Sequence, residues 1–383
     1  MKQEGNVIQK FREVVENRHQ YAENWKATTG GKVIGCMCSY VPVEIIYAAG
    51  MLPVRILGSH QLDRLSDAYL YGWVCPFWRD CLSQGLRGRY NYLDGIVYSH
   101  TCDATHSIFL IWRKYVPINF SHFIYMPGII QSPRALPLLT AEFADFKEVL
   151  EKQGNRLISE EELSTAVQEY NINRGLMKQV YEFRKKDEPP LTGKEALEIA
   201  LASQLMDVRE HNELLRQLLS ELPNQKLDRE TGVRLMLVGS VNDDLTFMEL
   251  MEGVGATCVI EENCASTKHF WDEVVAQGSQ LEAIASRYIN RWPCPVFDWK
   301  ETGEERGRWK RLWPLAQEYR VQGVVHLLQR FCGPNGYDLP YIRDMFGSRD
   351  IPVLTLEFDV TIPVGQFRTR IEAFLEMLTL ELI

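Results

Sequence analysis

The chain has 383 residues, of which 45% are hydrophobic and 24% charged, a composition typical of a globular protein with two or three domains. Its net charge of −9 argues against nucleic acid as a partner, because binding to phosphates needs clustered Lys and Arg. No apolar stretch approaches the roughly 18 residues that span a bilayer, and residues 1–20 lack the apolar core of a signal peptide. We therefore expect a cytoplasmic protein that binds neither nucleic acid nor a membrane.

Residues 1–30 are expected to form an N-terminal helix, and an alternating strand–helix pattern follows over residues 31–139. Pro42 suits the first turn of one of these helices, and another is expected to begin near Pro76. This alternation predicts a parallel sheet with helices on both faces, a first Rossmann-like domain. The expected strands are KVIGCMCSY, LPVRILG, DGIVYSH and NFSHFIYMP, and the expected helices are PVEIIYAAG, a segment from about 76, and ATHSIFLIWRKY.

Residues 140–230 carry long, charged segments with helical periodicity, interrupted at Pro189 and Pro190, and are expected to form a helical middle segment. Residues 231–383 return to the alternating pattern and are expected to form a second Rossmann-like domain. Its strands are expected in VRLMLVGS, ATCVIEEN, VQGVVHLLQ and IPVLTLEFD. The sequence thus predicts an α/β protein in which two parallel-sheet domains flank a helical segment.

Three cysteines lie where the expected strands give way to helices: Cys75 in CPFWRD, Cys102 in GIVYSHTCDATH and Cys332 in VVHLLQRFCGPNGYD. Open α/β sheets bind ligands at this edge, and unpaired N–H groups at a helix N-terminus stabilise a thiolate. Three soft ligands from distant segments indicate a metal site. Because closed structural zinc sites take four protein ligands, we favour an iron–sulfur cluster with one iron open to a non-cysteine ligand.

Simpler interpretations of these residues stay open. Cysteines are common in protein cores, and His100, Cys102 and His106 together offer a zinc site instead. Cys81 points about 240° around its helix from Cys75 and is not expected to share a ligand set with it.

Cys36 and Cys38 face the same way if one extended strand contains both, and they either line the site or pack in the core. The aromatic residues near the first cysteines are mainly expected in the core, although a dry aromatic wall also suits a redox centre. They are Trp73, Phe77, Trp78 and Tyr98.

Common nucleotide-binding motifs are absent. Neither Gly30-Gly31-Lys32 nor Gly193-Lys194 has the spacing of a phosphate-binding loop, so any ATP hydrolysis belongs to another chain. No G-x-G-x-x-G follows a strand, and no G-x-S-x-G is present, which argues against a nicotinamide cofactor and a serine hydrolase.

Several separated motifs, in this order, resemble the 2-hydroxyacyl-CoA dehydratase and benzoyl-CoA reductase subunit family over nearly the whole chain. They are most similar to the smaller cluster-binding subunit of the ATP-dependent benzoyl-CoA reductases. The motifs are GKVIGCMCSYVPVEIIYAAGMLPVRILG, CPFWRDCL, DGIVYSHTCDATH, QGVVHLLQRFC, IPVLTLEFD and TRIEAFLEML.

The resemblance implies a [4Fe–4S] cluster held by Cys75, Cys102 and Cys332, with the fourth position open. It also implies an active-site loop at residues 38–44, in which Ser39 and Glu44 are candidate catalytic residues. The family often has Pro-Glu-Glu where this chain has Pro-Val-Glu. Of the family's two carboxylates, only the second is present here, as Glu44.

The implied partners are a larger homologous cluster-binding subunit, two ATPase subunits carrying the activating cluster, reduced ferredoxin and benzoyl-CoA as the acyl-CoA thioester. This chain is expected to pass electrons to its partner and to complete the thioester pocket. His100 and His106, with Glu44, are candidates for proton delivery, and each can equally be a capping or packing residue.

Three rival functions remain. The nearest is the small subunit of a 2-hydroxyacyl-CoA dehydratase, which uses the same cluster to eliminate water. The others are a zinc-stabilised scaffold and a cluster-free assembly protein that keeps only the fold.

Overall fold

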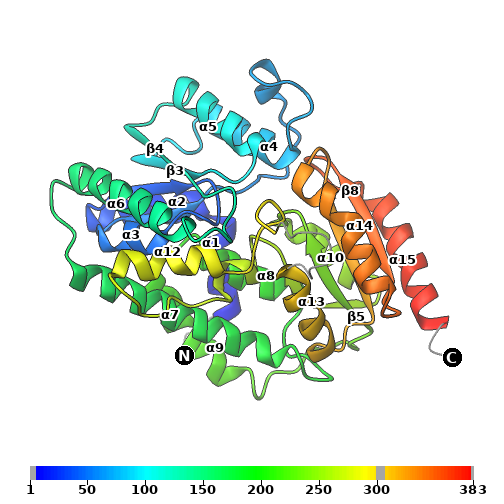
Figure 1. Ribbon diagram of the computed structural model, residues 1–383. Coiled ribbons are helices and arrows are strands. Elements are labelled where there is room, and N and C mark those ends of the chain that lie inside the picture. The colour runs from blue at the N-terminus through cyan, green and yellow to red at the C-terminus, as the bar shows by residue number, and fades with distance from the viewer. Residues whose placement is uncertain (1–5, 299–306, 381–383) are drawn as a thin grey trace.

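The computed structural model describes residues 6–298 and 307–380 and contains two four-stranded parallel sheets (Figure 1). The first sheet has the order β2-β1-β3-β4 and the second the order β6-β5-β7-β8. The predicted α/β class is therefore confirmed. The strands are β1 (Val33–Cys36), β2 (Leu52–Arg55), β3 (Gly95–Ser99), β4 (Phe120–Ile124), β5 (Val233–Gly239), β6 (Ala256–Glu262), β7 (Gly323–Gln329) and β8 (Val353–Phe358).

The helices fall into four groups along the chain. The N-terminal group is α1 (Val7–Glu16) and α2 (Arg18–Thr29), and the first sheet carries α3 (Val43–Ala48), the 3-10 helix η1 (Leu65–Ala68), α4 (Pro76–Leu86) and α5 (Asp103–Tyr115). The middle segment contains α6 (Ala135–Gly154), α7 (Glu160–Phe183), α8 (Gly193–Ala202) and α9 (Val208–Glu221). The last group is α10 (Leu245–Glu252), α11 (Thr267–Phe270), α12 (Gln280–Asn290), α13 (Gly307–Glu318), α14 (Gly333–Gly347) and α15 (Val364–Leu380).

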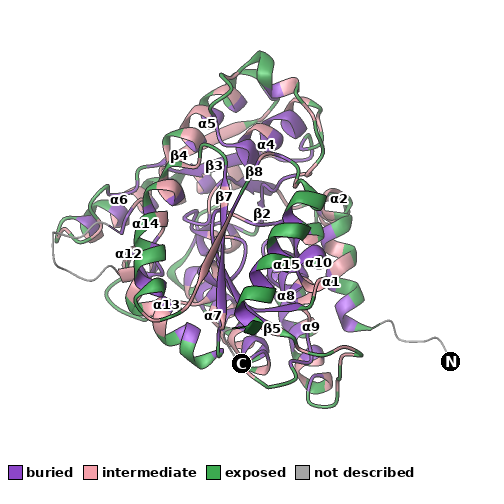
Figure 2. Cartoon of the chain, turned by 90° about the vertical axis from the view of Figure 1, so that its right-hand side faces the viewer, coloured by how far each residue is buried: buried purple, intermediate pink, exposed green. Residues whose placement is uncertain are grey.

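Burial differs between the two edges of each sheet. The central strands β1, β3, β5 and β7 and the edge strands β2 and β6 are almost wholly buried, whereas the opposite edge strands β4 and β8 are half-buried, as Figure 2 shows for β8. Gly95 in β3 has to be glycine, because a Cβ atom there would overlap the ring of Phe120 on β4. One expectation is corrected: β1 ends at Cys36, so Cys38 lies in the following turn and strand alternation does not relate the two thiols.

Helices pack across the domain boundaries that the sequence predicts. The boundaries themselves stay a prediction. Helix α1 packs on α8 of the middle segment, and Arg12 forms an ion pair of 2.9 Å with the buried Glu198. Helix α12 leaves the second sheet and packs against α6 and α7, as Figure 1 shows in yellow. Side chains from 274–297, including Ile284 and Tyr288, complete the hydrophobic core on one face of the first sheet.

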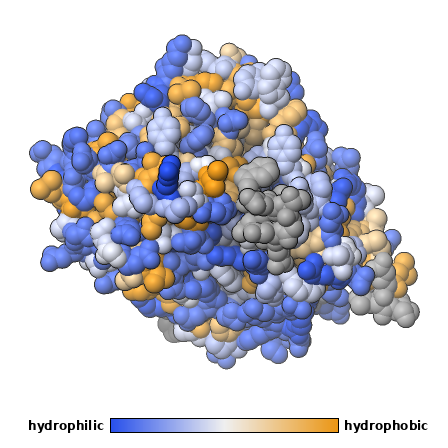
Figure 3. Space-filling view, in the orientation of Figure 1, coloured by the Kyte–Doolittle hydropathy of each residue, from blue (hydrophilic) through white to orange (hydrophobic). Residues whose placement is uncertain are grey.

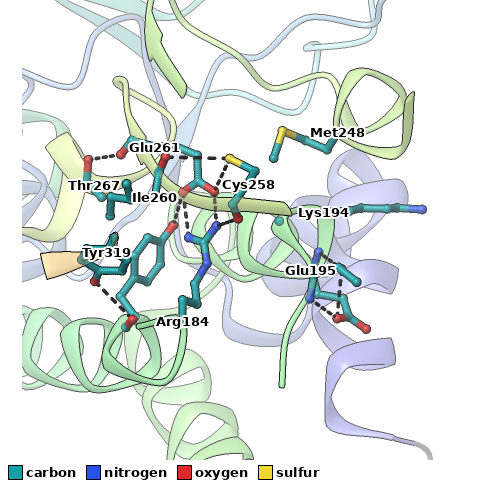
Figure 4. A network of polar contacts seen from close by, with 12 residues as sticks. Arg184, Lys194, Glu195, Met248, Cys258, Ile260, Glu261, Thr267 and Tyr319 are labelled. Atoms are coloured by element: carbon teal, nitrogen blue, oxygen red, sulfur yellow. Dashed lines mark hydrogen bonds and ion pairs between the residues drawn. The ribbon is translucent and has the colours of Figure 1, made fainter. Parts of the chain in front are cut away.

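Helix α7 is bound to both sheet domains through buried arginines. Arg174 pairs with Glu44 of α3, and both side chains are at most 3% exposed. At the end of the helix Arg184 pairs with Glu261 of β6, and its Nη1 lies 2.9 Å from Glu261 Oε2 (Figure 4). The Tyr181 hydroxyl donates to the same oxygen at 2.9 Å. The helix therefore fixes the position of one sheet relative to the other.

The loops that follow β2 and β5 also meet between the domains. His60 Nε2 lies 3.0 Å from Asp243 Oδ1, and Gly58 N–H donates to Asp243 Oδ2 at 2.7 Å. Burial disfavours the charged imidazole, but Asp243, Asp244 and Asp80 more than offset this and raise the pKa of His60 to about 9. The pair is therefore ionised at neutral pH.

The surface is mixed in character. Hydrophobic residues on the face in Figure 3 form small groups separated by hydrophilic ones. No helix within residues 6–298 and 307–380 is long and apolar enough to cross a membrane.

We expect Glu261→Gln to lower the free energy of unfolding by about 3–5 kcal/mol, because it leaves the Arg184 charge buried without its counter-ion. Urea denaturation followed by circular dichroism measures this change. The matched control is Asp187→Asn, which breaks an exposed pair with Arg320 and should cost less than about 1 kcal/mol. Equal losses in the two variants would show that α7 is not held by its buried pair.

We also expect a pH-dependent contribution from His60. Its pKa is raised in the folded protein, so the stabilisation is fully present below the unfolded-state value of about 6.5 and disappears as the pH rises through about 9. The contribution is at most about 3 kcal/mol. Comparing unfolding of wild type and His60→Gln at pH 6 and pH 9.5 checks this, since the difference between the two proteins should shrink at the higher pH. A constant difference would contradict the assignment.

Candidate functional site

The three predicted cysteines occupy the same kind of position in three helices. Cys75, Cys102 and Cys332 are the N-cap residues of α4, α5 and α14. Cys102 follows β3 and Cys332 follows β7, and each of these strands lies next to the first strand of its sheet, where the chain reverses direction across the sheet. Open parallel sheets bind ligands at such switch points.

The three thiols lie close enough to affect one another electrostatically. Burial raises the pKa of the Cys75 thiol well above its ordinary value, and Cys332 and Cys102 raise it further. Burial likewise raises the pKa of Cys102 to about 11, with a contribution from Cys332. The fold therefore gathers in one region three thiols that are far apart in the sequence, and deprotonating all of them needs a compensating positive charge.

Hydrogen-bond donors surround these sulfur atoms. The backbone N–H groups of Phe77 and Trp78 lower the pKa of Cys75 against the larger effect of burial. Thr105 Oγ1 lies 3.0 Å from Cys102 Sγ, and Asn335 Nδ2 donates to Cys332 Sγ at 3.3 Å. Donors of this kind stabilise thiolates and orient metal ligands.

Within the described ranges, no three His, Cys, Asp or Glu side chains converge tightly enough to hold a single metal ion. This applies to the zinc alternative at His100, Cys102 and His106 and to the three-cysteine set. A four-iron cluster makes a different demand, because each cysteine binds a separate iron of a wider body. Three thiols at helix N-termini, of which Cys75 is buried and Cys102 and Cys332 are half-buried, each lie near N–H or O–H groups and fit that donor set.

Ser39 and Glu44 are buried near this region. Glu44 is fully buried, and the Tyr288 hydroxyl donates to its Oε2 at 3.0 Å. Burial alone would raise the pKa of Glu44, but Arg174 and Arg287 lower it below its ordinary value. Ser39 is 8% exposed, and its carbonyl oxygen accepts a hydrogen bond from Arg291. The Glu44 carboxylate is thus held ionised by arginines at neutral pH.

His100 and His106 flank Cys102 as a ring pair. Their ring centroids are 5.6 Å apart, and both rings pack against Phe123. Partial burial, together with His106, lowers the pKa of His100, so its imidazole is neutral at pH 7. Both side chains are partly exposed and next to the Cys102 helix start, which is compatible with carrying protons.

The nearby aromatic residues divide into two groups. Phe77, Trp78 and Tyr98 are buried, as their core interpretation predicts. The core expectation is wrong for Trp73, whose side chain is 67% exposed.

Sequence reasoning missed a cavity beside this region. Its lining includes Cys36, Cys38, Arg55, Gln204 and His269, drawn from both domains and the middle segment. Cys38 connects the two places, since its Sγ lies 3.5 Å from the Thr101 hydroxyl and its charge affects the pKa of Cys102. Arg55 lies in the middle of the expected strand LPVRILG, so no signal in the sequence indicated that it lines a cavity.

A model of the 2-hydroxyglutaryl-CoA dehydratase D-component family matches residues 38–378. The chain therefore belongs to this family of α/β proteins. It is 25% identical to the (R)-phenyllactyl-CoA dehydratase beta subunit of Clostridium sporogenes, over 96% of this chain and 97% of that protein. It is 24% identical to a benzoyl-CoA reductase subunit of Thauera aromatica, over 88% of each chain. A third relative is the (R)-2-hydroxyglutaryl-CoA dehydratase beta subunit of Acidaminococcus fermentans, 22% identical over 97% of this chain and 99% of that one.

Proposed function

We propose that this chain is the [4Fe–4S] cluster-binding subunit of an enzyme that acts on acyl-CoA thioesters. The observation that carries the proposal is the grouping of Cys75, Cys102 and Cys332 at three helix N-termini. The names of its relatives, which are dehydratase and reductase subunits, support an enzyme subunit of this kind. When bound, such a cluster supplies single electrons.

The chain's own residues prepare this place for a negatively charged ligand set. Helix N-termini and the N–H groups of Phe77 and Trp78 stabilise the Cys75 thiolate. Asn335 does the same for Cys332 and orients its sulfur. Buried Phe77 and Trp78 keep water away from the thiols.

Proton handling falls to the residues beside Cys102. We propose that His100 and His106, which are partly exposed, exchange protons with the bound acyl group's surroundings. For Glu44 we propose a positioning role, since its ion pair with Arg174 fixes the loop that carries Ser39. Ser39 then lines the adjoining cavity.

A partner subunit is part of the proposal. Large side chains next to two of the cysteines are exposed: Trp73 by 67%, Phe331 by 52% and Tyr337 by 74%. Aromatic residues of this kind are enriched where protein subunits meet. We propose the larger homologous subunit as the occupant of this face, with reduced ferredoxin and two ATPase subunits supplying electrons, in keeping with the absence of a phosphate-binding loop from this sequence.

Two reactions fit this role. The first candidate is ATP-dependent reduction of benzoyl-CoA to a cyclic dienoyl-CoA, supported by the relative from Thauera aromatica and by the motifs CPFWRDC and SHTCDATH. The second is elimination of water from a 2-hydroxyacyl-CoA, favoured by the longer coverage of the dehydratase beta subunits. In either reaction this chain passes electrons to its partner and completes the thioester pocket.

Single replacement of Cys75, Cys102 or Cys332 by Ser should lower iron and acid-labile sulfide severalfold, since each variant loses one of three ligands. Iron and sulfide analysis of anaerobically purified protein measures this, with about four of each per chain expected in the wild type. Cys81→Ser is the matched control, because that thiol is buried in the same helix α4 and should leave the iron content unchanged. One zinc per chain without iron, or equal losses in all four variants, would refute the ligand assignment.

Electron stoichiometry distinguishes the two reactions. Assay of the co-purified complex with benzoyl-CoA, ATP and reduced ferredoxin should oxidise ferredoxin in proportion to the diene formed. Repeated turnover of a 2-hydroxyacyl-CoA after one activating electron would instead assign the chain to a dehydratase.

A further inference from the structure

The cavity between the two domains is lined from five separate parts of the chain. The loop after β1, the end of β2, helix α7, the turn after α8 and helix α11 all contribute. Its polar lining comes from Ser39, Arg55, Tyr170, Ser203, Gln204 and His269. Space for the centres of water-sized atoms amounts to about 20 Å³. The occupant must therefore be small.

The unpaired positive charge of Arg55 indicates that the occupant is an anion. Its side chain is 6% exposed, and its Nη1 is buried without a hydrogen-bond partner. Across residues 6–298 and 307–380, its guanidinium forms no ion pair with any carboxylate. An uncompensated buried cation costs several kcal/mol, so proteins pair such groups or bind an anion there.

Other buried arginines in the molecule show what is missing at Arg55. Arg184 has Glu261 as its counter-ion, and Arg308 has Glu262 and Asp338. Arg234 has no carboxylate partner, but its guanidinium donates to three backbone carbonyl oxygens. Among the residues that the structure describes, the Arg55 guanidinium has neither kind of partner.

The surroundings of the cavity carry a surplus of positive charge. Burial lowers the pKa of His269 well below its ordinary value, and Arg287, Arg291, Arg174 and Arg55 lower it further. Glu44 is paired with Arg174 and offsets only part of this charge. Such a field favours a negatively charged ligand.

A second unsatisfied atom adds a chemical requirement. Gln204 Nε2 donates to the carbonyl oxygens of Ala200 and Ala265 at 3.0 and 2.9 Å, which fixes the orientation of the amide. Its Oε1 is left buried with no donor. A ligand that satisfies both residues must accept hydrogen bonds from the Arg55 guanidinium and donate a hydrogen bond to Gln204 Oε1.

We propose that this cavity is a binding site for a small planar oxyanion of the carboxylate class, held by Arg55 and oriented by Gln204. A planar oxyanion matches the paired N–H donors of a guanidinium. Hydrogencarbonate is the member of this class whose own hydroxyl can donate to Gln204, so it should bind more tightly than formate. The proposal does not require a cluster to be bound by Cys75, Cys102 and Cys332.

Thermal unfolding of the full-length chain, isolated anaerobically, tests the proposal with sodium hydrogencarbonate, formate and chloride at equal ionic strength and pH 8. Hydrogencarbonate at a hundred times its Kd should raise the Tm by about 3 °C or more, and formate should need a higher concentration. In Arg55→Met both shifts should vanish. In the absence of these anions that variant should be as stable as the wild type or more stable, because no buried charge is left.

Arg234→Met is the matched control, since it should lower the Tm and keep the anion response. A response that persists in Arg55→Met, or a chloride shift as large as that of formate, would overturn the proposal. Stabilisation by an acyl-CoA but by neither oxyanion would also overturn it. Iron analysis of Arg55→Met should match the wild type, so that failure of the oxyanion site and failure of the cluster proposal can be told apart.

Discussion

Two buried arginines on one helix hold the molecule together. Arg174 lies within α7, and Arg184 lies at its C-terminal end. The two are ten residues apart, which is about 15 Å along the helix axis. Each neutralises a carboxylate from a different sheet domain, Glu44 in the first and Glu261 in the second. Because an unpaired buried charge is costly, neither domain can move away from α7 without a large penalty. The space between the two sheets is therefore a fixed feature of the fold.

The two domains place equivalent loops at this space. In both sheets the first strand along the chain is central, the second strand lies on one side of it and the third on the other. Each sheet therefore has its switch point beside its first strand. Cys102 after β3 and Cys332 after β7 occupy corresponding positions in this topology. Helix N-termini from both halves are then directed at one region, and their N–H groups favour negatively charged sulfur.

Local features of the sequence were sufficient for much of this architecture. All eight strands lie within the predicted segments, since short apolar runs bounded by Gly, Pro and Asp are strong signals. The three cysteines could be selected because strand-to-helix junctions are visible in the sequence. The return of 274–297 to the first domain could not be predicted, because its apolar pattern does not show which core it enters. Arg55 was equally hidden, since the lack of a counter-ion is a property of three-dimensional neighbours.

The late position of residues 274–297 in the chain affects how the protein can be made. When the ribosome has released the first sheet and its helices, one apolar face still lacks Ile284, Tyr288 and Phe297. Helices α6 and α7 cover that face only in part, and the remainder stays open until roughly 150 more residues have been synthesised, at about 5–20 residues per second. The N-terminal half is thus a poor candidate for separate expression, and nascent chains should depend on chaperones during this interval of many seconds.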